Sequence, residues 1–212
     1  MFKRVPSLFR SLKEDMDFLL DFTYRQIGNT TGETRIQYGY LEHRPWEDLT
    51  YRVGKITLPF GYYNQKRFYA FQRIEMSPPT FQTAILGLPI SHVGAGAQKR
   101  FKTAWSRIDA DLYAVNGYGA TTGNAKFFRS ATLPGGLALS GNVGPTNNNG
   151  DVAFGGRLSF AELAGKDMEA GASYYRGAWD SGGSHYFSMA NAHFHAGVAG
   201  LDAVAEVLHL DV

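Results

Sequence analysis

A two-residue alternation over residues 15–25, DMDFLLDFTYR, limits most strongly what this chain can fold into. One side of the alternation carries the apolar residues Met16, Phe18, Leu20, Phe22 and Tyr24, and the other, mostly polar side carries Asp15, Asp17, Leu19, Asp21, Thr23 and Arg25. Because a β-strand sends alternate side chains to opposite faces, the segment predicts a strand with one apolar face and one charged face. The apolar face packs either in a soluble core or against lipid.

The same alternation recurs along the chain. In the segment 34–42, Ile36, Tyr38 and Tyr40 lie opposite Arg35, Gln37 and Gly39. Clear alternation also marks residues 49–57, 107–115, 151–160 and 167–175, and weaker candidates are residues 101–105, 125–132, 137–143, 185–196 and 201–208. The clear segments are roughly nine to eleven residues long, the length of a tilted membrane strand. About ten strands joined by turns predict an all-β protein with an antiparallel meander.

Composition excludes several classes of protein. Hydrophobic residues make up 44% of the chain and aromatic residues 14%, too many for a disordered protein. A net charge of +2 is too small to indicate a nucleic-acid partner, and the absence of cysteine excludes disulfides and thiolate metal sites. The uncharged stretch 76–98 contains Pro78, Pro79 and Pro89, so it does not predict a membrane-spanning helix.

Two features favour lipid over a soluble core as the environment of the apolar faces. Those faces contain small residues such as Ala110, Ala170 and Ala172, whereas a close-packed core needs bulkier partners. Aromatic residues cluster near the expected strand ends, as in the girdles of membrane barrels: Trp46, Trp105, Trp179, Tyr62, Tyr63, Tyr118 and Tyr174. The pattern therefore favours part of a transmembrane β-barrel. A soluble β-sandwich or barrel that binds a ligand or carbohydrate through loop aromatics stays open as the alternative, as does a non-conducting membrane barrel.

The stretch YRVGKITLPFGYYN, residues 51–64, resembles a segment of bacterial outer-membrane porins, especially the phosphate-selective porin family and its relatives. The matching positions are Arg52, Gly54, Lys55, Pro59, Phe60, Gly61 and Asn64. The resemblance implies passive diffusion of small polar or anionic solutes through a water-filled barrel in a lipid bilayer, without a cofactor or catalytic residue. It also implies an outer-membrane location, leaves a homotrimer open as the assembly, and makes Glu206 an inward-facing residue of the last strand.

The resemblance divides the chain into a basic N-terminal segment, residues 1–13, and a porin-like barrel, residues 14–212. Residues 1–13 show a weak helical pattern and no apolar stretch of signal-peptide length, so the signal peptide of the family is missing from this sequence. Family members form about sixteen strands, and we therefore expect an incomplete barrel. A long loop at about residues 64–98 is expected to fold into the barrel.

Charged residues on the polar faces and on the loop are the candidates for lining the pore. They are Arg25, Arg35, Arg52, Lys66, Arg67, Arg73, Arg107, Asp109, Asp111 and Arg157. Because a phosphate-selective channel needs a predominantly basic lumen, this mixture of charges predicts a channel for small polar solutes with at most a weak anion preference.

The histidines and serines predict neither a metal site nor an enzyme. His185, His193 and His195 share one strand face, but no carboxylate stands beside them in the sequence at ligand spacing. Ser184 and His185 are adjacent and point to opposite faces of a strand, so they cannot form a catalytic pair with each other.

Overall fold

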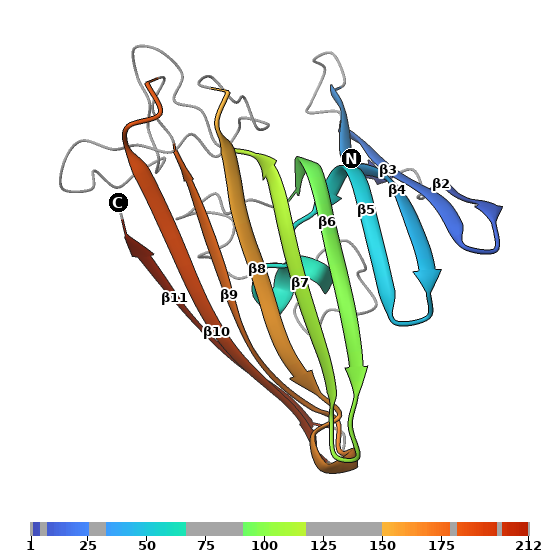
Figure 1. The fold of residues 1–212 in the computed structure, drawn as a ribbon, viewed down its shortest axis with the longest axis vertical. Coiled ribbons are helices and arrows are strands. Elements are labelled where there is room, and N and C mark those ends of the chain that lie inside the picture. Colours follow the sequence, from blue (N-terminus) through green and yellow to red (C-terminus); the bar gives the residue numbers. More distant parts are fainter. Residues whose placement is uncertain are drawn as a thin grey trace.

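A computed structural model of the chain describes residues 2–4, 8–25, 33–66, 91–117, 150–178, 182–198 and 201–211. These residues form one antiparallel sheet whose long strands follow the order of the chain (Figure 1). The strands are β1 (Phe2–Arg4), β2 (Leu8–Lys13), β3 (Met16–Arg25), β4 (Glu33–Trp46), β5 (Leu49–Thr57), β6 (Ser91–Lys102), β7 (Arg107–Asn116), β8 (Val152–Ala161), β9 (Met168–Ala178), β10 (Tyr186–Val198) and β11 (Leu201–Asp211). A short helix, α1 (Tyr63–Lys66), follows β5, and a 3₁₀ turn (Leu163–Gly165) follows β8. Among the described residues, no helix is long and apolar enough to cross a bilayer.

The sheet confirms the predicted all-β antiparallel meander. Strands β3 to β11 pair with their chain neighbours, and β1 and β2 both pair with β3. The segment 1–13 thus contributes strands, not the helix that its weak pattern suggested. Within the described residues β11 pairs with β10 alone, so the sheet is open and is not closed into a barrel.

Alternation located most of the strands, and it failed where small residues replace large ones. Strand β5 spans Leu49–Thr57, the predicted range. Strand β6 was not predicted in full, because its first residues, SHVGAGAQ, contain glycine and alanine in place of the large apolar residues that mark a strand face. The loop expected at about residues 64–98 therefore does not extend to residue 98, since β6 begins at Ser91. Of the weak candidate 101–105, Phe101 and Lys102 form the end of β6, whereas residues 103–106 form a turn in which the Thr103 N–H donates to Ser106 O at 2.9 Å. The candidates 125–132 and 137–143 lie outside the described residues.

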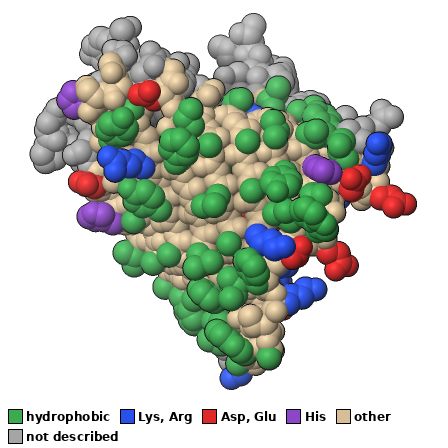
Figure 2. Space-filling model, in the orientation of Figure 1, with side chains coloured by type: hydrophobic (Ala, Val, Ile, Leu, Met, Phe, Trp, Pro, Cys, Tyr) green, Lys and Arg blue, Asp and Glu red, His purple; other side chains and the backbone are tan. Residues whose placement is uncertain are grey.

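The two faces of the sheet differ in an unusual way. We call the face against which residues 58–64 pack the inward face, and the opposite one the outward face. In β7 and β8, Leu112 on the outward face is 71% exposed, whereas Arg157 on the inward face is 7% exposed. Figure 2 shows hydrophobic side chains spread over the outward face. This distribution is the reverse of that in a soluble protein, where arginine is almost never fully buried and large apolar residues are the ones enclosed.

One expected face assignment, in β4, is wrong. Asp21 pairs with Tyr38 but Phe22 pairs with Ile36, so Gln37 is an extra residue on β4 and forms a β-bulge. Because of the bulge, the side chains before and after Gln37 do not share a face. Ile36, before it, is exposed on the outward face. Tyr38, after it, is buried and Tyr40 packs against the inward apolar cluster, so these two tyrosines do not lie on the face of Ile36 as expected.

An apolar cluster occupies the inward face at the end of the sheet where the long connections lie. It comprises Ile56, Leu58, Phe60, Tyr113, Val115, Ala153, Tyr175, Phe187 and Met189. Tyr62 and Tyr63, which were expected in an outer aromatic girdle, are buried on this side of the sheet instead. Trp46 and Trp105 are exposed at the opposite end, beside the short turns.

We expect Phe187→Ala to destabilise the fold by about 3–5 kcal/mol, because its ring is buried and lies 5.4 Å from the Tyr175 ring, so that truncation leaves a cavity. Phe194→Ala, on the outward face of the same strand, is the matched control and is expected to cost less than about 1 kcal/mol. The free energies of unfolding come from urea titrations followed by tryptophan fluorescence. Equal losses in the two variants would contradict the assignment of faces.

Candidate functional site

Residues 58–64, which we call the infolded segment, cross the inward face and bind strands far away in the sequence. The backbone N–H of Gly61 donates to Ser173 Oγ of β9 at 2.9 Å. The N–H of Tyr62 donates to Glu206 Oε1 of β11 at 3.1 Å. Asn64 Nδ2 donates to Leu58 O at 2.7 Å and closes the segment on itself. The segment therefore connects β5 to the other side of the sheet.

The porin-like motif supplies the residues of this segment. Pro59, Phe60, Gly61 and Asn64 are all buried, and Gly54 lies in β5 with φ +129°. Gly61 has φ +66°, and a Cβ at this position would collide with the carboxylate of Glu206. Only glycine therefore permits both this backbone conformation and the hydrogen bond to Glu206.

Glu206 holds the segment from the far side of the sheet. Its Oε1 accepts hydrogen bonds from the Tyr62 N–H and, at 2.9 Å, from Asn191 Nδ2 of β10. The Tyr62 ring stacks on the His195 ring with centroids 5.1 Å apart, and its centroid lies 5.8 Å from that of His193. The two histidines thus form the floor beneath the segment.

Among the described residues, Arg157 is the most deeply buried cation of the inward face. It lies across from Asp111 in the register of β7 and β8, with Nη1 3.9 Å from Asp111 Oδ2. Arg157 Nη2 also forms an ion pair with Glu169 of β9, which His193 Nε2 approaches to 3.3 Å. A buried guanidinium is tolerated only with such partners, because unpaired burial of a charge costs several kcal/mol.

A second group of charges, the arginine row, lies on β4, β5 and β6 and is partly open to solvent. Arg52 Nε donates to Glu42 Oε2 at 2.7 Å, and Arg44 pairs with both Glu42 and Asp17. Arg100 Nε donates to Asp109 Oδ1 at 2.8 Å.

The arginine row exposes its cations more than its carboxylates. The Arg44 and Arg100 side chains are 40% and 42% exposed, whereas those of Asp17 and Asp109 are 3% and 9% exposed. The surface that this part of the inward face presents to solvent is therefore basic, although its formal charges nearly balance.

The structure brings part of the predicted pore-lining set together. Arg52, Arg107, Asp109, Asp111 and Arg157 all lie on the inward face of neighbouring strands. Arg25, Arg35 and Lys66 lie on described backbone, but their side chains lie outside the description, as do Arg67 and Arg73 entirely.

Sequence reasoning missed Glu42 and Arg44 as site residues. The predicted strand stopped at residue 42, whereas β4 runs on to Trp46. Continuing the alternation by one more step would have placed Arg44 beside Glu42. No carboxylate lies beside the histidines in the sequence, but Glu169 and Asp202 reach His193 and His195 from neighbouring strands at 3.3 Å each.

The turn between β4 and β5 is tied to β6. Lys99 Nζ of β6 pairs with Asp48, and the Arg100 N–H donates to Asp48 O at 2.7 Å. The hydrogen bond from Lys99 holds the pKa of Asp48 below its ordinary value, because it favours the ionised carboxylate. The turn thus helps to fix the strands that carry the arginine row.

Comparison of the chain with protein-family models, with curated proteins and with solved structures finds no match.

We expect Gly61→Ala to release the infolded segment, because the added Cβ collides with the carboxylate that holds it. In this variant, the backbone amides of residues 61 and 62 should exchange their hydrogens faster than in the parent chain. The matched control is Gly165→Ala, whose φ of +69° carries the same backbone strain but whose Cβ meets nothing within 4 Å. If exchange at Tyr62 does not change in Gly61→Ala, Glu206 is not the anchor.

Proposed function

We propose that this chain forms part of the wall of an outer-membrane porin, through which small polar solutes diffuse with a preference for anions. The observation that carries the proposal is the reversed polarity of the sheet. Large apolar side chains are exposed on the outward face, whereas paired ionised side chains are enclosed on the inward face.

The exposed apolar side chains need an apolar environment. Removing one large aliphatic or aromatic side chain from water stabilises a fold by about 1.5–3 kcal/mol. If the outward face were in water, the fold would lack this stabilisation at each of the exposed positions. These positions extend over the sheet from β4 to β11: Leu41, Tyr51, Val53, Val93, Leu112, Phe154, Leu158, Tyr174, Phe194, Leu201 and Val207. Lipid tails contacting this face would supply the missing apolar environment.

Strand length and aromatic placement support the same reading. Strands β5 and β7 contain 9 and 10 residues, close to the roughly 9–11 that a tilted strand needs to span a bilayer. Trp46 and Trp105 are exposed at the short-turn end of the sheet, where an interfacial aromatic girdle would lie.

The open edges of the sheet set a requirement on the proposal. Unpaired backbone groups in lipid cost several kcal/mol each, so a membrane sheet must be closed. Further strands must therefore pair with the outer edges of β1, β2 and β11 in the membrane.

The arginine row supports the anion preference. Guanidinium groups present several N–H donors that replace part of the hydration shell of a passing anion. The carboxylates of Asp17, Glu42 and Asp109 lie behind the guanidinium groups and hold them in place. Fixed donors of this kind bias a wet passage toward anions without binding them tightly enough to stop diffusion.

We expect Leu112→Arg to reduce folding into lipid vesicles by about 2–4 kcal/mol, because it places a charge near the middle of the lipid-facing side of β7. Gln98→Arg introduces the same side chain on the inward face of the adjacent strand and should fold as the parent chain does. The folded fraction in phosphatidylcholine vesicles is measured over a urea series. Equal tolerance of both variants would argue against a lipid-facing outward side.

Conductance tests the channel itself. The purified full chain, reconstituted in planar bilayers, should give discrete conductance steps, and a KCl gradient should give a reversal potential of anion-preferring sign. The double variant Arg52→Gln/Arg100→Gln should move that potential toward cation preference, because it removes two guanidinium groups of the arginine row. Arg176→Gln, which removes an arginine from the outward face, is the control and should leave the potential unchanged.

Two results would count against the porin. One is a chain that is soluble and monomeric without detergent, which the soluble-domain alternative requires. The other is a chain that inserts into bilayers but gives no conductance step, which would favour a non-conducting membrane protein over a channel.

A further inference from the structure

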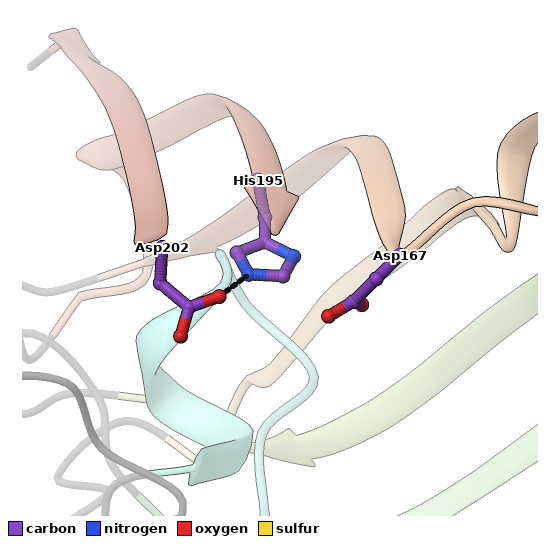
Figure 3. A group of neighbouring side chains, drawn as sticks. All are labelled: Asp167, His195 and Asp202. Carbon is purple, nitrogen blue, oxygen red and sulfur yellow. Dashed lines mark hydrogen bonds and ion pairs between the residues drawn. The ribbon is translucent and has the colours of Figure 1, made fainter. Parts of the chain in front are cut away.

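We propose that Asp167, His195 and Asp202 form a binding site for one divalent transition-metal ion of the Zn²⁺ type. One ligand atom from each residue lies within 4.8 Å of the other two. The residues come from three places in the chain: the turn before β9, the end of β10 and the start of β11. Figure 3 shows the His195 ring between the two carboxylates.

The sheet register gathers these residues at one point. Gly197 of β10 pairs with Asp202 of β11, and its backbone N–H donates to Asp167 O at 2.7 Å. Asp167 and Asp202 thus approach the same position of β10 from its two sides, and His195 precedes that position by two residues on the same face.

Gly197 makes the approach of the carboxylates possible. A Cβ at this position would lie 2.6 Å from Asp167 Oδ2 and 3.2 Å from Asp202 Oδ1. The space that a side chain would occupy is filled by two carboxylate groups. A larger residue would push the carboxylates apart, so the absence of a side chain is part of the site.

His195 is held in a fixed orientation. Its ring is buried, stacks on Tyr62 of the infolded segment, and places Nε2 3.3 Å from Asp202 Oδ1. This separation is long for a hydrogen bond to a carboxylate, which is about 2.7–2.9 Å when charge-assisted. It matches the spacing of about 3.3–3.5 Å between two ligands of a tetrahedral ion with bonds of about 2.0–2.2 Å.

The charges at the site favour a cation. Among the residues that the structure describes, neither Asp167 nor Asp202 forms an ion pair with lysine or arginine. Two carboxylates at this spacing repel each other, and a divalent ion would neutralise both. One imidazole with two carboxylates is a ligand set that Zn²⁺ accepts, with water completing the coordination.

The site does not depend on the porin proposal. Its ligands lie at the short-turn end of the sheet, apart from the arginine row of β4 to β6. A bound ion would join the β8–β9 turn to β10 and β11, and through the Tyr62 stack it would reinforce the floor on which the infolded segment rests.

Isothermal titration of Zn²⁺ into the full chain, stripped of metal and held in detergent micelles, tests the proposal. We expect one equivalent to bind, and we expect His195→Gln and Asp202→Asn each to weaken binding at least about tenfold. Gly197→Ala keeps every ligand but should also weaken binding, since its Cβ displaces Asp167. Circular dichroism establishes that each variant retains its strands. If His195→Gln does not fold, Asp167→Asn replaces it as a ligand variant, because Asp167 is exposed and its substitution should not disturb the fold.

Matched controls lie on the same strand as Asp202. His209→Gln and Asp211→Asn remove an exposed imidazole and an exposed carboxylate of β11 away from the site, and both should bind Zn²⁺ as the parent chain does. The proposal is overturned if the parent chain binds no Zn²⁺. It is equally overturned if the site variants bind Zn²⁺ as tightly as the controls, because binding would then occur elsewhere.

Discussion

The pairing of Arg157 with Asp111 and Glu169 is the interaction on which the arrangement of the sheet depends. These side chains come from three consecutive strands and are enclosed on one face. Because an enclosed charge needs a partner of opposite sign, the register of β7, β8 and β9 must bring these residues together. The alternation of each strand then sends Leu112 and Leu158 to the other face, where they are exposed. The polarity of both faces thus follows from the same register.

The infolded segment divides the inward face into an apolar part and a polar part. At the end with the long connections, Leu58 and Phe60 cover an apolar cluster, and this part resembles an ordinary protein core. Toward the short turns, Gly61 and Tyr62 cross to Ser173 and Glu206, and the surrounding side chains are polar. In the porin that we propose, the wet passage lies along the arginine row, beside the segment, where guanidinium groups meet solvent.

Particular residues show how far sequence reasoning reaches. The alternation in β8 correctly separated Val152 and Phe154 from Ala153 and Arg157, because the environment of a regular strand changes with every residue. It failed at Tyr38, where a bulge adds a residue, and in β6, where glycine and alanine carry no alternation. The resemblance to porins predicted that the loop at about 64–98 folds inward, and residues 67–90 of that loop lie outside the described residues. That residues 58–64 cross the sheet, and that β9 and β11 anchor them, became evident only from the fold.

The sequence by itself determined the all-β fold class and the faces of the regular strands, because both follow from the two-residue period of an extended chain. It could not determine which charges meet. Arg44 reaches Asp17 from 27 positions away, and Asp167, His195 and Asp202 converge only where the register places them around Gly197. Contacts of this kind depend on the pairing of strands that are distant along the chain. Only the tertiary structure settles that pairing, because no local pattern encodes which residue of one strand lies opposite a given residue of the next.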